Sequence, residues 1–521
     1  MPSKAPKTSR HLEVERKFDV DESTVTPSFE GIAAVVRVEK SHVDSLDATY
    51  FDTPKQDLAR NKITLRRRTG GHDAGWHLKL PAGPDARTEI HAPLEASAED
   101  TVPGELLDVV LAIVRDRPVG PVARITTRRE SQVLYGALDT ALAEFSNDHV
   151  IAWAADSSDS SGGPDSQPQE QEWREWELEL VGTNGSPDTE LLSRLGNRLL
   201  DAGAAPAGHG SKLARVLGAT ARSNGTPPSE DPLHRAVAEQ VDQLLVWDRA
   251  VRADAYDAVH QMRVTTRKIR SLLRDSHDSF GLSDGDWVLD ELRELAGVLG
   301  VARDAEVLAE RYEHQLDQLS PDLVRGPVWE RLVAGARRRY ETGLRRSLIA
   351  MRSQRYFRLL DALDSIVAEI PGAQSDEEAT PVTIDAAYKK VRKAAKAADS
   401  QRQDAGPDSP EAEAAAEHDH DAALHLIRKR AKRLRYTASA TGEDDVSKQA
   451  KAIQTLLGDH HDSVVSREHL IEQSEAAHAA GEDTFTYGLL YQQEIELADS
   501  CRGQLDDALR KLDKSVRKAR G

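Results

Sequence analysis

The order of apolar and polar residues divides the chain into two halves. Residues 10–217 contain short runs in which charged and apolar residues alternate between turn signals, which is typical of strands with one wet face. From residue 232 onward helical periodicity replaces this alternation. The pattern therefore predicts an α+β protein with a strand-rich N-terminal half and an all-α C-terminal half. The expected strands include 11–18, 62–68, 75–80, 87–92, 122–130, 132–139 and 173–181.

Three polar, low-complexity segments interrupt these halves. Residues 219–231 form the clearest linker, and residues 155–171 are interpreted as a flexible loop between two strands. Residues 400–421 interrupt the helical half. The run His-Asp-His-Asp at 418–421 falls in this last segment, and we interpret it as solvated chain rather than as a metal site.

The helical half contains an internal repeat. The run His260-Gln-Met-Arg-Val-Thr-Thr-Arg-Lys-Ile-Arg270 aligns with His425-Leu-Ile-Arg-Lys-Arg-Ala-Lys-Arg-Leu-Arg435. Leu299-Gly-Val-Ala-Arg-Asp304 follows the first copy, and Leu457-Gly-Asp-His-His-Asp462 follows the second. Two motifs that recur in the same order at similar separations predict two helical bundles related by duplication.

Composition limits the class of protein. A chain of 521 residues is long enough for two or more domains, each with its own core. The net charge of −19 argues against a general nucleic-acid binder, and the sequence offers no groove-reading element for specific DNA binding. Cys501 is the only cysteine, which excludes a disulfide framework and favours a reducing cytoplasm. No apolar run approaches the length of a membrane span, so we expect no membrane insertion.

Charged residues recur at every second position within the expected strands. Glu13, Glu15 and Lys17 share one face of the first strand, because side chains at i, i+2 and i+4 point the same way. If the strands close into a barrel, such faces line one lumen with a cationic wall and a carboxylate cluster. Carboxylates bind hard cations and cations bind phosphate, so the pattern predicts a metal–phosphate site. Other residues that share faces are Arg66 with Arg68, His77 with Lys79, Arg87 with Glu89, Arg124 with Arg128, and Glu175 with Glu177 and Glu179.

Each copy of the helical repeat places cations along one helix face. The cations of one copy fall within an arc of roughly 80°, at positions that core residues usually occupy. Like charges one turn apart destabilise a helix, and a bound anion would offset this repulsion. A solvated basic face is the alternative interpretation, but the duplication favours a basic groove. The stripes consist of His260, Arg263, Arg267 and Arg270 in the first copy, and of His425, Arg428, Lys432 and Arg435, with Arg433 beside them, in the second.

A series of short motifs runs through the strand half in a fixed order. The motifs are Glu13-x-Glu-x-Lys17, Tyr50-Phe-Asp-Thr-Pro54, Ile63-Thr-Leu-Arg-Arg-Arg68, Trp76-His-Leu-Lys-Leu-Pro81, Arg87-Thr-Glu89, Arg124 with Arg128, Glu175-x-Glu-x-Glu-Leu180 and Ser211-Lys212. In this order they resemble the CYTH family of triphosphate tunnel metalloenzymes. The resemblance implies an eight-stranded antiparallel β tunnel or barrel, which we place at residues 8–218, with residues 219–231 as the linker that follows.

The resemblance also implies roles for individual residues. Glu13, Glu15 and Lys17 would be catalytic, and the cofactor would be Mg²⁺ or Mn²⁺. Glu175 stays open, because the family pattern can be placed two residues either way. The implied metal ligands are Glu13, Glu15, Asp139, Glu177 and Glu179. The implied triphosphate binders, beside Lys17, are Arg66, Arg68, Lys79, Arg124, Arg128 and Lys212.

The helical half is similar to a second family. Val259-His-Gln-Met-Arg263, Gly300-Val-Ala-Arg-Asp304, Lys432-Arg-Leu-Arg-Tyr436 and Leu457-Gly-Asp459 resemble motifs of the CHAD family, a conserved-histidine α-helical domain often joined to CYTH domains. We place this domain at residues 232–515. The resemblance implies binding of inorganic polyphosphate, and we assign this binding to the two cationic stripes.

The two resemblances together predict a metal-dependent triphosphatase with a C-terminal polyphosphate-binding domain. Its substrate would be inorganic triphosphate or a triphosphate-bearing metabolite. The first alternative is a polyphosphate-binding scaffold whose tunnel is weakly active or inactive. The second alternative is adenylate cyclase chemistry on ATP, which requires an adenine pocket that the sequence does not identify. We expect a cytoplasmic location, with polyphosphate granules as a candidate site of association.

Overall fold

The computed structural model describes most of the chain. The described residues are 8–98, 101–154, 170–182, 188–218, 231–275, 280, 286–368, 383–404 and 410–520. The chain forms two compact units, Met1–Gly297 with Ser347–Ile370 and Val298–Arg346 with Pro371–Gly521. Most of the expected linker and of the loop at 155–171 lies outside the described residues. Within the described ranges, no helix combines the length and the apolarity that a bilayer span requires.

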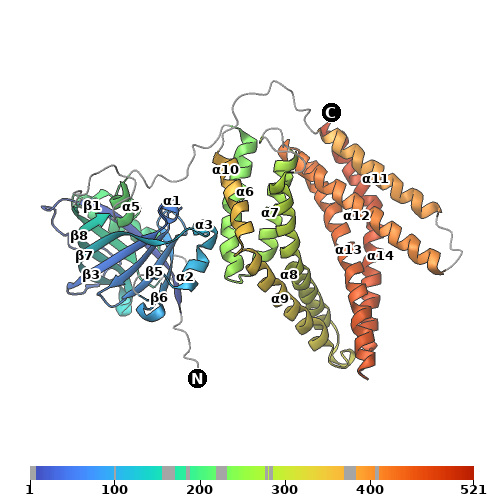
Figure 1. Ribbon diagram of the computed structural model, residues 1–521, viewed down its shortest axis with the longest axis horizontal. Coiled ribbons are helices and arrows are strands. Elements are labelled where there is room, and N and C mark those ends of the chain that lie inside the picture. The colour runs from blue at the N-terminus through green and yellow to red at the C-terminus, as the bar shows by residue number, and fades with distance from the viewer. Residues whose placement is uncertain are drawn as a thin grey trace. The chain divides into compact units, whose positions relative to one another are not determined.

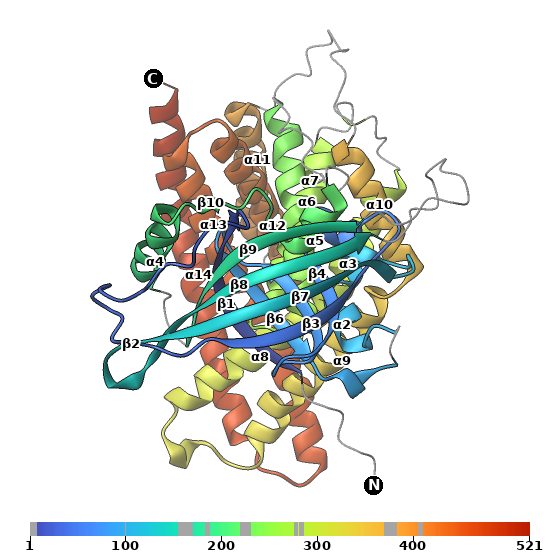
Figure 2. The same ribbon diagram turned by 90° about the vertical axis from the view of Figure 1, so that its left-hand side faces the viewer.

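The N-terminal strands close into a barrel. Among the described residues, eight antiparallel strands follow the order β1-β6-β5-β4-β3-β7-β8-β9, and β9 pairs back onto β1. Figure 2 shows β9, β8, β7 and β3 side by side on the wall of this barrel. The predicted eight-stranded antiparallel barrel is therefore confirmed. Its strands are β1 Ser9–Val20, β3 His42–Asp52, β4 Thr64–Thr69, β5 Gly75–Pro81, β6 Ala86–Ala92, β7 Gly120–Tyr135, β8 Ala141–Ala154 and β9 Glu170–Leu180, with short strands β2 Arg37–Val38 and β10 Ala205–Pro206 paired at the edges.

One pair of expected strands is wrong. The segments 122–130 and 132–139 were expected as two strands, but β7 is continuous from Gly120 to Tyr135. A bulge at Leu134 and Tyr135 ends its regular pairing. The chain then turns and returns as β8, a strand that the expected set did not contain. This shift of the turn decides which carboxylate of the region reaches the lumen.

The largest apolar clusters of the barrel lie between the outside of the sheet and short helices. Val14 and Phe18 alternate with the charged residues of β1 and pack against α4 (Thr189–Asp201). On another side, Trp76 and Leu78 pack with residues of α2 (Gly104–Val109) and α3 (Leu111–Val114). Because the helices supply apolar partners outside, the inner face of the sheet can carry charged side chains.

A short helix fills one part of the barrel interior. Leu213 and Val216 of α5 (Lys212–Leu217) form a buried cluster with inward residues of the sheet, including Ala48, Ile125 and Trp173. The Ser211 hydroxyl accepts a hydrogen bond from the Ala214 N–H at 3.1 Å and caps the helix. The cap fixes the first residue of α5, Lys212, in position.

The motif Tyr50-Phe-Asp-Thr-Pro54 has a structural role. The Asp52 carboxylate is buried and accepts hydrogen bonds from the backbone N–H groups of Thr53, Leu58 and Ala59 at 2.7 to 2.9 Å. The last two belong to α1 (Asp57–Arg60). A carboxylate that satisfies several backbone donors fixes a tight turn, so this motif anchors the chain between β3 and β4.

The C-terminal half is helical, as predicted. Figure 1 shows α11, α12, α13 and α14 as long helices of the second compact unit. The two histidine motifs lie on α7 and α12, and the two motifs that follow them lie on α8 and α13. The helices are α6 Pro232–Arg252, α7 Ala258–Asp275, α8 Trp287–Gln318, α9 Gly335–Ala350, α10 Gln354–Ala368, α11 Ile384–Asp404, α12 Pro410–Ala440, α13 Asp444–Ala479 and α14 Phe485–Ala519.

The expectation for residues 400–421 is corrected. Residues 410–421 belong to α12, so the His-Asp-His-Asp run lies on a helix and not in a loop. Pro410 occupies the first helical position, where its missing N–H is harmless, and the following Glu- and Ala-rich residues favour helix. Low complexity here reflects helix-forming composition and not irregular structure.

Candidate active site

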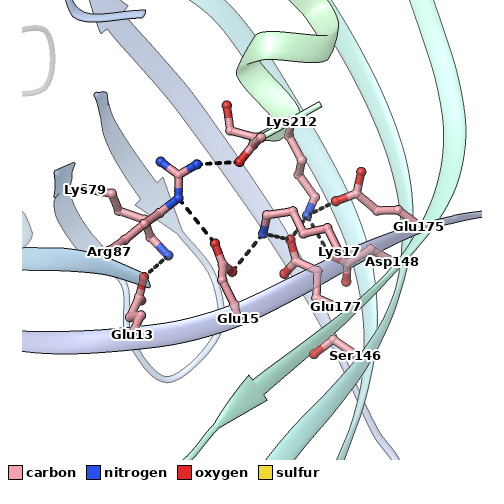
Figure 3. Close-up of polar contacts among 12 residues, drawn as sticks. Glu13, Glu15, Lys17, Lys79, Arg87, Ser146, Asp148, Glu175, Glu177 and Lys212 are labelled. Atoms are coloured by element: carbon pink, nitrogen blue, oxygen red, sulfur yellow. Dashed lines mark hydrogen bonds and ion pairs between the residues drawn. The ribbon is translucent and has the colours of Figure 1, made fainter. Parts of the chain in front are cut away.

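The register of the closing strands brings the two ends of the barrel sequence together. Glu15 pairs with Glu179 and Lys17 pairs with Glu177 across β1 and β9. Directly paired residues point to the same side of a sheet, so these side chains share the lumen. Figure 3 shows Glu15, Lys17 and Glu177 converging there. The closed barrel therefore builds one site from residues about 160 positions apart.

The lumen contains most residues that the sequence predicted. It brings together the first-strand residues Glu13, Glu15 and Lys17, and Glu177 and Glu179 of β9. It also holds Arg87 and Glu89, which share a face of β6, and Arg129, which the sequence analysis missed. Among the described residues, the charged lining consists of Glu13, Glu15, Asp73, Glu89, Glu177 and Glu179 with Lys17, Arg66, Arg68, Lys79, Arg87, Arg129 and Lys212.

The structure corrects the expected face of β7. Arg124 and Arg128 are exposed outside the lumen, and Arg124 pairs with Asp47 with its Nε 3.0 Å from Oδ1. Ile125, Thr127 and Arg129 face the lumen instead. The consecutive polar residues from Thr126 to Glu130 fit either face equally well, so alternation alone does not fix the register. Arg129 is therefore the arginine that this strand supplies to the site.

The structure also corrects the expected carboxylate of this region. Asp139 lies at the turn between β7 and β8, is 72% exposed and pairs with Arg37 with a distance of 2.6 Å between Oδ1 and Nη2. Asp148, on β8, is fully buried and contacts the lumen cations. Polar residues at Glu144, Ser146 and Asp148 were the available signal, because they alternate along β8.

One group of carboxylates is already neutralised by cations. The Lys212 Nζ lies 2.8 Å from Asp148 Oδ2 and 2.7 Å from both Glu175 Oε1 and Glu177 Oε1. Glu177 also contacts Arg129, and its Oε1 lies 2.5 Å from the Lys17 Nζ. We call Asp148, Glu175 and Glu177 the paired cluster. Burial opposes ionisation of Glu177, but Lys17, Lys212 and Arg129 hold its pKa well below the usual value.

A second group of carboxylates is less fully compensated. We call Glu13, Glu89 and Glu179, together with the adjacent His11, the open cluster. Burial opposes ionisation of Glu89, but His77 and Lys79 hold its pKa well below the usual value. Glu13 has one close cation, the Lys79 Nζ at 2.6 Å from Oε2. Burial, together with the nearby carboxylates of Glu89 and Glu179, raises the pKa of Glu13 to about 8. Burial, with the charges of Glu15 and Glu177, raises the pKa of Glu179 to about 7.

The open cluster fits a divalent metal ion. Its carboxylate oxygens are the donors that Mg²⁺ and Mn²⁺ prefer, and its excess negative charge would be offset by a dication. One ligand atom each of His11, Glu13 and Glu89 lies within 4.8 Å of the other two. In the paired cluster the Lys212 ammonium already occupies the corresponding position. Glu13 and Glu89, with Glu179 in the same lumen, are therefore the carboxylates best placed to hold a metal.

Arg66 and Arg68 form a cationic group in the same lumen, in which Arg68 also contacts the Asp73 carboxylate. Arg66 and Arg68 share a face of β4, and the Arg66 Nη1 lies 3.4 Å from the Tyr50 hydroxyl. Burial, with the charges of Arg66 and Arg129, lowers the pKa of Arg68 to about 9. Glu89 is close enough to act in the opposite direction. An anion bound at these arginines would relieve their mutual repulsion, beside the group of carboxylates that would hold a cation.

The cationic stripe of α7 is half-buried against the following helix. The Arg263 Nε donates to the Ala296 carbonyl at 3.3 Å, and the Arg270 Nε donates to the Leu289 carbonyl at 3.0 Å. Arg267 is exposed, and His260 is half-buried. These contacts hold Arg263 and Arg270 against α8, while Arg267 is exposed.

The stripe of α12 has its own set of contacts. The rings of His425 and His461 lie 5.3 Å apart, and Arg435 lies over the Tyr436 ring at 4.7 Å. Gly458 lies against the Arg428 guanidinium, and a Cβ there would be 3.5 Å from it, an ordinary van der Waals contact. The motif Leu457-Gly-Asp459 therefore packs beside a residue of the stripe.

Comparison with known proteins identifies both domains. A CYTH domain matches residues 11–181, and a CHAD domain matches residues 235–471. The chain is 72% identical over 523 residues to a Mycobacterium tuberculosis protein described as "Uncharacterized protein Rv2226", covering 100% of both chains. The chain therefore belongs to the family of proteins in which a CYTH domain precedes a CHAD domain. CYTH domains generally have the triphosphate tunnel metalloenzyme fold and depend on divalent metals.

Solved structures show more distant likenesses. PptA from Streptomyces chartreusis is 20% identical, covers 54% of this chain and 99% of its own, and has a TM-score of 0.42. The CHAD domain from the plant Ricinus communis is 20% identical, covers 53% of this chain and 90% of its own, and has a TM-score of 0.38. Likenesses of this size support no inference about activity.

Proposed function

We propose that the chain is a divalent-metal-dependent phosphohydrolase that acts on inorganic triphosphate or on a triphosphate-bearing metabolite. One observation carries the proposal: a single lumen places the open cluster of carboxylates beside the guanidinium groups of Arg66 and Arg68. A metal–triphosphate complex has the complementary arrangement, a dication next to a polyanion. Membership of the CYTH–CHAD family supports the same class of substrate.

The lumen cations would bind and orient the substrate. A triphosphate carries about four negative charges, so several fixed cations are needed to hold it away from bulk water. Arg66, Arg68 and Arg129 present guanidinium groups that suit phosphate oxygens. Lys17 and Lys79 contact carboxylates in the free protein, and a bound phosphate would share or replace these contacts. Transfer of a phosphoryl group to water needs this positioning more than a covalent nucleophile.

The carboxylates would divide into two roles. Glu13, Glu89 and Glu179 would hold the metal. Bound Mg²⁺ or Mn²⁺ would neutralise charge on the reacting phosphoryl group and orient or activate a water. Glu15 and Glu177 contact Lys17 from two sides, so they position this lysine. Burial opposes ionisation of Glu15, but Lys17 and Lys79 lower its pKa to about 2 and keep it charged.

The helical domain would bind inorganic polyphosphate. The stripes on α7 and α12 present cations and histidines at half-buried and exposed positions, which suits a linear polyanion without bases. The domain would locate the protein on polyphosphate or supply substrate to the barrel. The alternative remains a polyphosphate-binding scaffold in which the barrel is weakly active or inactive.

Phosphate release by the purified full chain tests the proposal. The substrates are inorganic triphosphate, ATP and thiamine triphosphate, each with Mg²⁺ or Mn²⁺, and the control is the Glu13→Ala/Glu15→Ala double variant. We expect release from at least one substrate, and its loss in the control. Release of pyrophosphate from ATP would indicate cyclase chemistry instead. If the wild type hydrolyses none of the three yet binds long-chain polyphosphate, the scaffold function replaces the proposed one.

A further inference from the structure

Histidines gather at one mouth of the lumen. His11, His42, His72, His77 and His91 line this opening together with residues of the open cluster. A site built for Mg²⁺ alone has no need of imidazole, because Mg²⁺ prefers oxygen ligands. Imidazole nitrogen is a common ligand of first-row transition metals. The histidines therefore raise the question of which dication this mouth is built to hold.

One of these histidines lies against the two carboxylates best placed for a metal. The His11 Nε2 is 3.1 Å from Glu89 Oε2 and 3.7 Å from Glu13 Oε1. Ligand atoms around a tetrahedral ion with bonds of about 2.1 Å lie about 3.4 Å apart. His11 therefore already lies at this spacing from both carboxylates, and one ligand atom of each of the three residues lies within 4.8 Å of the other two.

The sheet fixes these three ligands. His11 and Glu13 share one face of β1, and His11 is the direct cross-strand partner of Glu89 on β6. Two ligands on one strand and a third on its neighbour need no loop to bring them together. Sites on paired strands are held more precisely than sites on loops.

A second histidine orients one of the ligands from behind. The His77 Nδ1 lies 2.6 Å from Glu89 Oε1, and its Nε2 lies 3.0 Å from the Asp73 carbonyl. His77 is buried, with 1% of its surface exposed. Glu89 thus has one oxygen held by His77 and the other directed to His11. Outer contacts of this kind fix metal-binding carboxylates in many metal sites.

The paired cluster shows that three close acids do not suffice. Its oxygens also lie within 4.8 Å of one another, but the Lys212 ammonium lies within 2.8 Å of all three residues. In the group of His11, Glu13 and Glu89, the close ammonium is that of Lys79, on Glu13. His11 is half exposed, so an ion can enter from the mouth, and a fourth coordination position remains for water or a phosphate oxygen.

We propose that His11, Glu13 and Glu89 form a mixed nitrogen and oxygen site for a first-row transition-metal dication, with His77 as a positioning residue for Glu89. Binding at this site is independent of turnover. Its use by the barrel rests on the proposed hydrolase function, in which the site makes Mn²⁺, Co²⁺ or Zn²⁺ a better cofactor than Mg²⁺.

Binding of Co²⁺ to the metal-stripped full chain tests the site directly. Co²⁺ reports its ligands through its visible absorption and substitutes for Zn²⁺ in such sites. His11→Ala should weaken Co²⁺ binding by roughly 10- to 100-fold and change the spectrum. The matched control is His42→Ala: His42 lines the same mouth and is 51% exposed, as is His11, but it pairs with Asp44 outside the cluster. It should bind Co²⁺ as the wild type does.

The outcomes separate this site from the proposed function. Equal Co²⁺ affinity and equal spectra in His11→Ala and wild type would overturn the site, whatever the activity. A loss of Co²⁺ binding confined to His11→Ala supports it, even if the wild type hydrolyses no triphosphate. If the protein is a hydrolase, His11→Ala should also shift the ratio of Mn²⁺- to Mg²⁺-supported kcat/KM towards Mg²⁺. Unfolding midpoints of the three proteins, measured without metal, check that all of them are folded.

Discussion

The paired cluster and the open cluster both consist mainly of buried carboxylates of the same barrel, yet they differ in charge balance. Asp148, Glu175 and Glu177 surround the ammonium of Lys212, while Glu13 and Glu179 repel neighbouring carboxylates. The difference arises from the chain that follows the barrel, because α5 inserts a lysine at one group and not at the other. A buried carboxylate that the fold pairs with its own cation is therefore structural. One that lacks such a cation is suited to bind a cationic ligand.

Removal of Lys212 should have the largest effect, a loss of folding stability that arises in the paired cluster. Lys212→Met leaves three buried carboxylates without their shared ammonium, which should lower the free energy of unfolding by about 3 to 5 kcal/mol. Urea denaturation of the full chain measures the loss. Arg215→Met on the same helix is the matched control, because its partner Asp19 is 38% exposed, and it should cost at most about 1 kcal/mol. Equal losses of unfolding free energy in the two variants would show that Lys212 does not specifically stabilise the paired cluster.

The next largest expected difference is in kcat/KM between variants of two neighbouring arginines. Arg129 faces the lumen and contacts Asp148 and Glu177, whereas Arg128 is exposed on the other side of β7. Arg129→Ala should lower kcat/KM for the preferred triphosphate by about 10²- to 10³-fold, because a fixed phosphate-binding cation is lost. Arg128→Ala should stay within about twofold of the wild type. Similar losses of kcat/KM in both variants would contradict the β7 register that places Arg129, and not Arg128, in the lumen.

The smallest expected effect is a change in folding stability on Glu→Gln substitution, with opposite signs in the two clusters. The pKa of Glu13 is about 8 in the folded protein and about 4.5 in an unfolded chain, so the folded state binds the additional proton between these values. Stability supplied by protonated Glu13 is therefore present below pH 4.5 and is lost as the pH rises to 8. In the presence of a chelator, Glu13→Gln should be more stable than the wild type at pH 8 by on the order of 2 kcal/mol, with little difference at pH 5.

Glu177→Gln provides the contrasting variant. The pKa of Glu177 lies well below its usual value, so its charged form stabilises the fold at neutral pH. The substitution should lower the unfolding midpoint at pH 7 to 8, where Glu13→Gln raises it. Thermal unfolding from pH 5 to 8 compares both variants. Destabilisation by Glu13→Gln at pH 8 would show that the open cluster is compensated without a metal.

Alternation along the strands predicted the site where charges alternate cleanly. The faces of β1, β4, β5 and β9 follow the expected parity, since apolar residues such as Val14 and Trp176 lie between the charged ones and pack outside the barrel. On β7 the rule fails, because the inward residues near α5 are Ala123 and Ile125, and the exposed outer face carries Arg124. Charged residues therefore identify the inward face of a strand only where the lumen is open to water, and not where α5 fills it.

The missed carboxylate has a related physical cause. The position of a hairpin turn decides whether a residue lies in a turn or in a strand, and Gly136, directly after Tyr135, is the local signal that ends β7. The expected strand at 132–139 runs through this glycine, so it placed Asp139 in a strand and left β8, with Asp148, unpredicted. The pairing of Asp148 with Glu175 across β8 and β9 depends on residues far apart in the chain, which a local pattern does not reveal.

The position of Lys212 also sets the shortest fragment in which the barrel can be studied. The region that matches the CYTH domain ends at residue 181, whereas the ammonium that neutralises Asp148, Glu175 and Glu177 comes from residue 212. A truncation at the end of the matched region would keep all eight strands, with Lys17 and Arg129, but would remove the ammonium that these three acids share. Expression fragments of this barrel should extend through Leu217, because the unit that folds is longer than the unit that sequence comparison recognises.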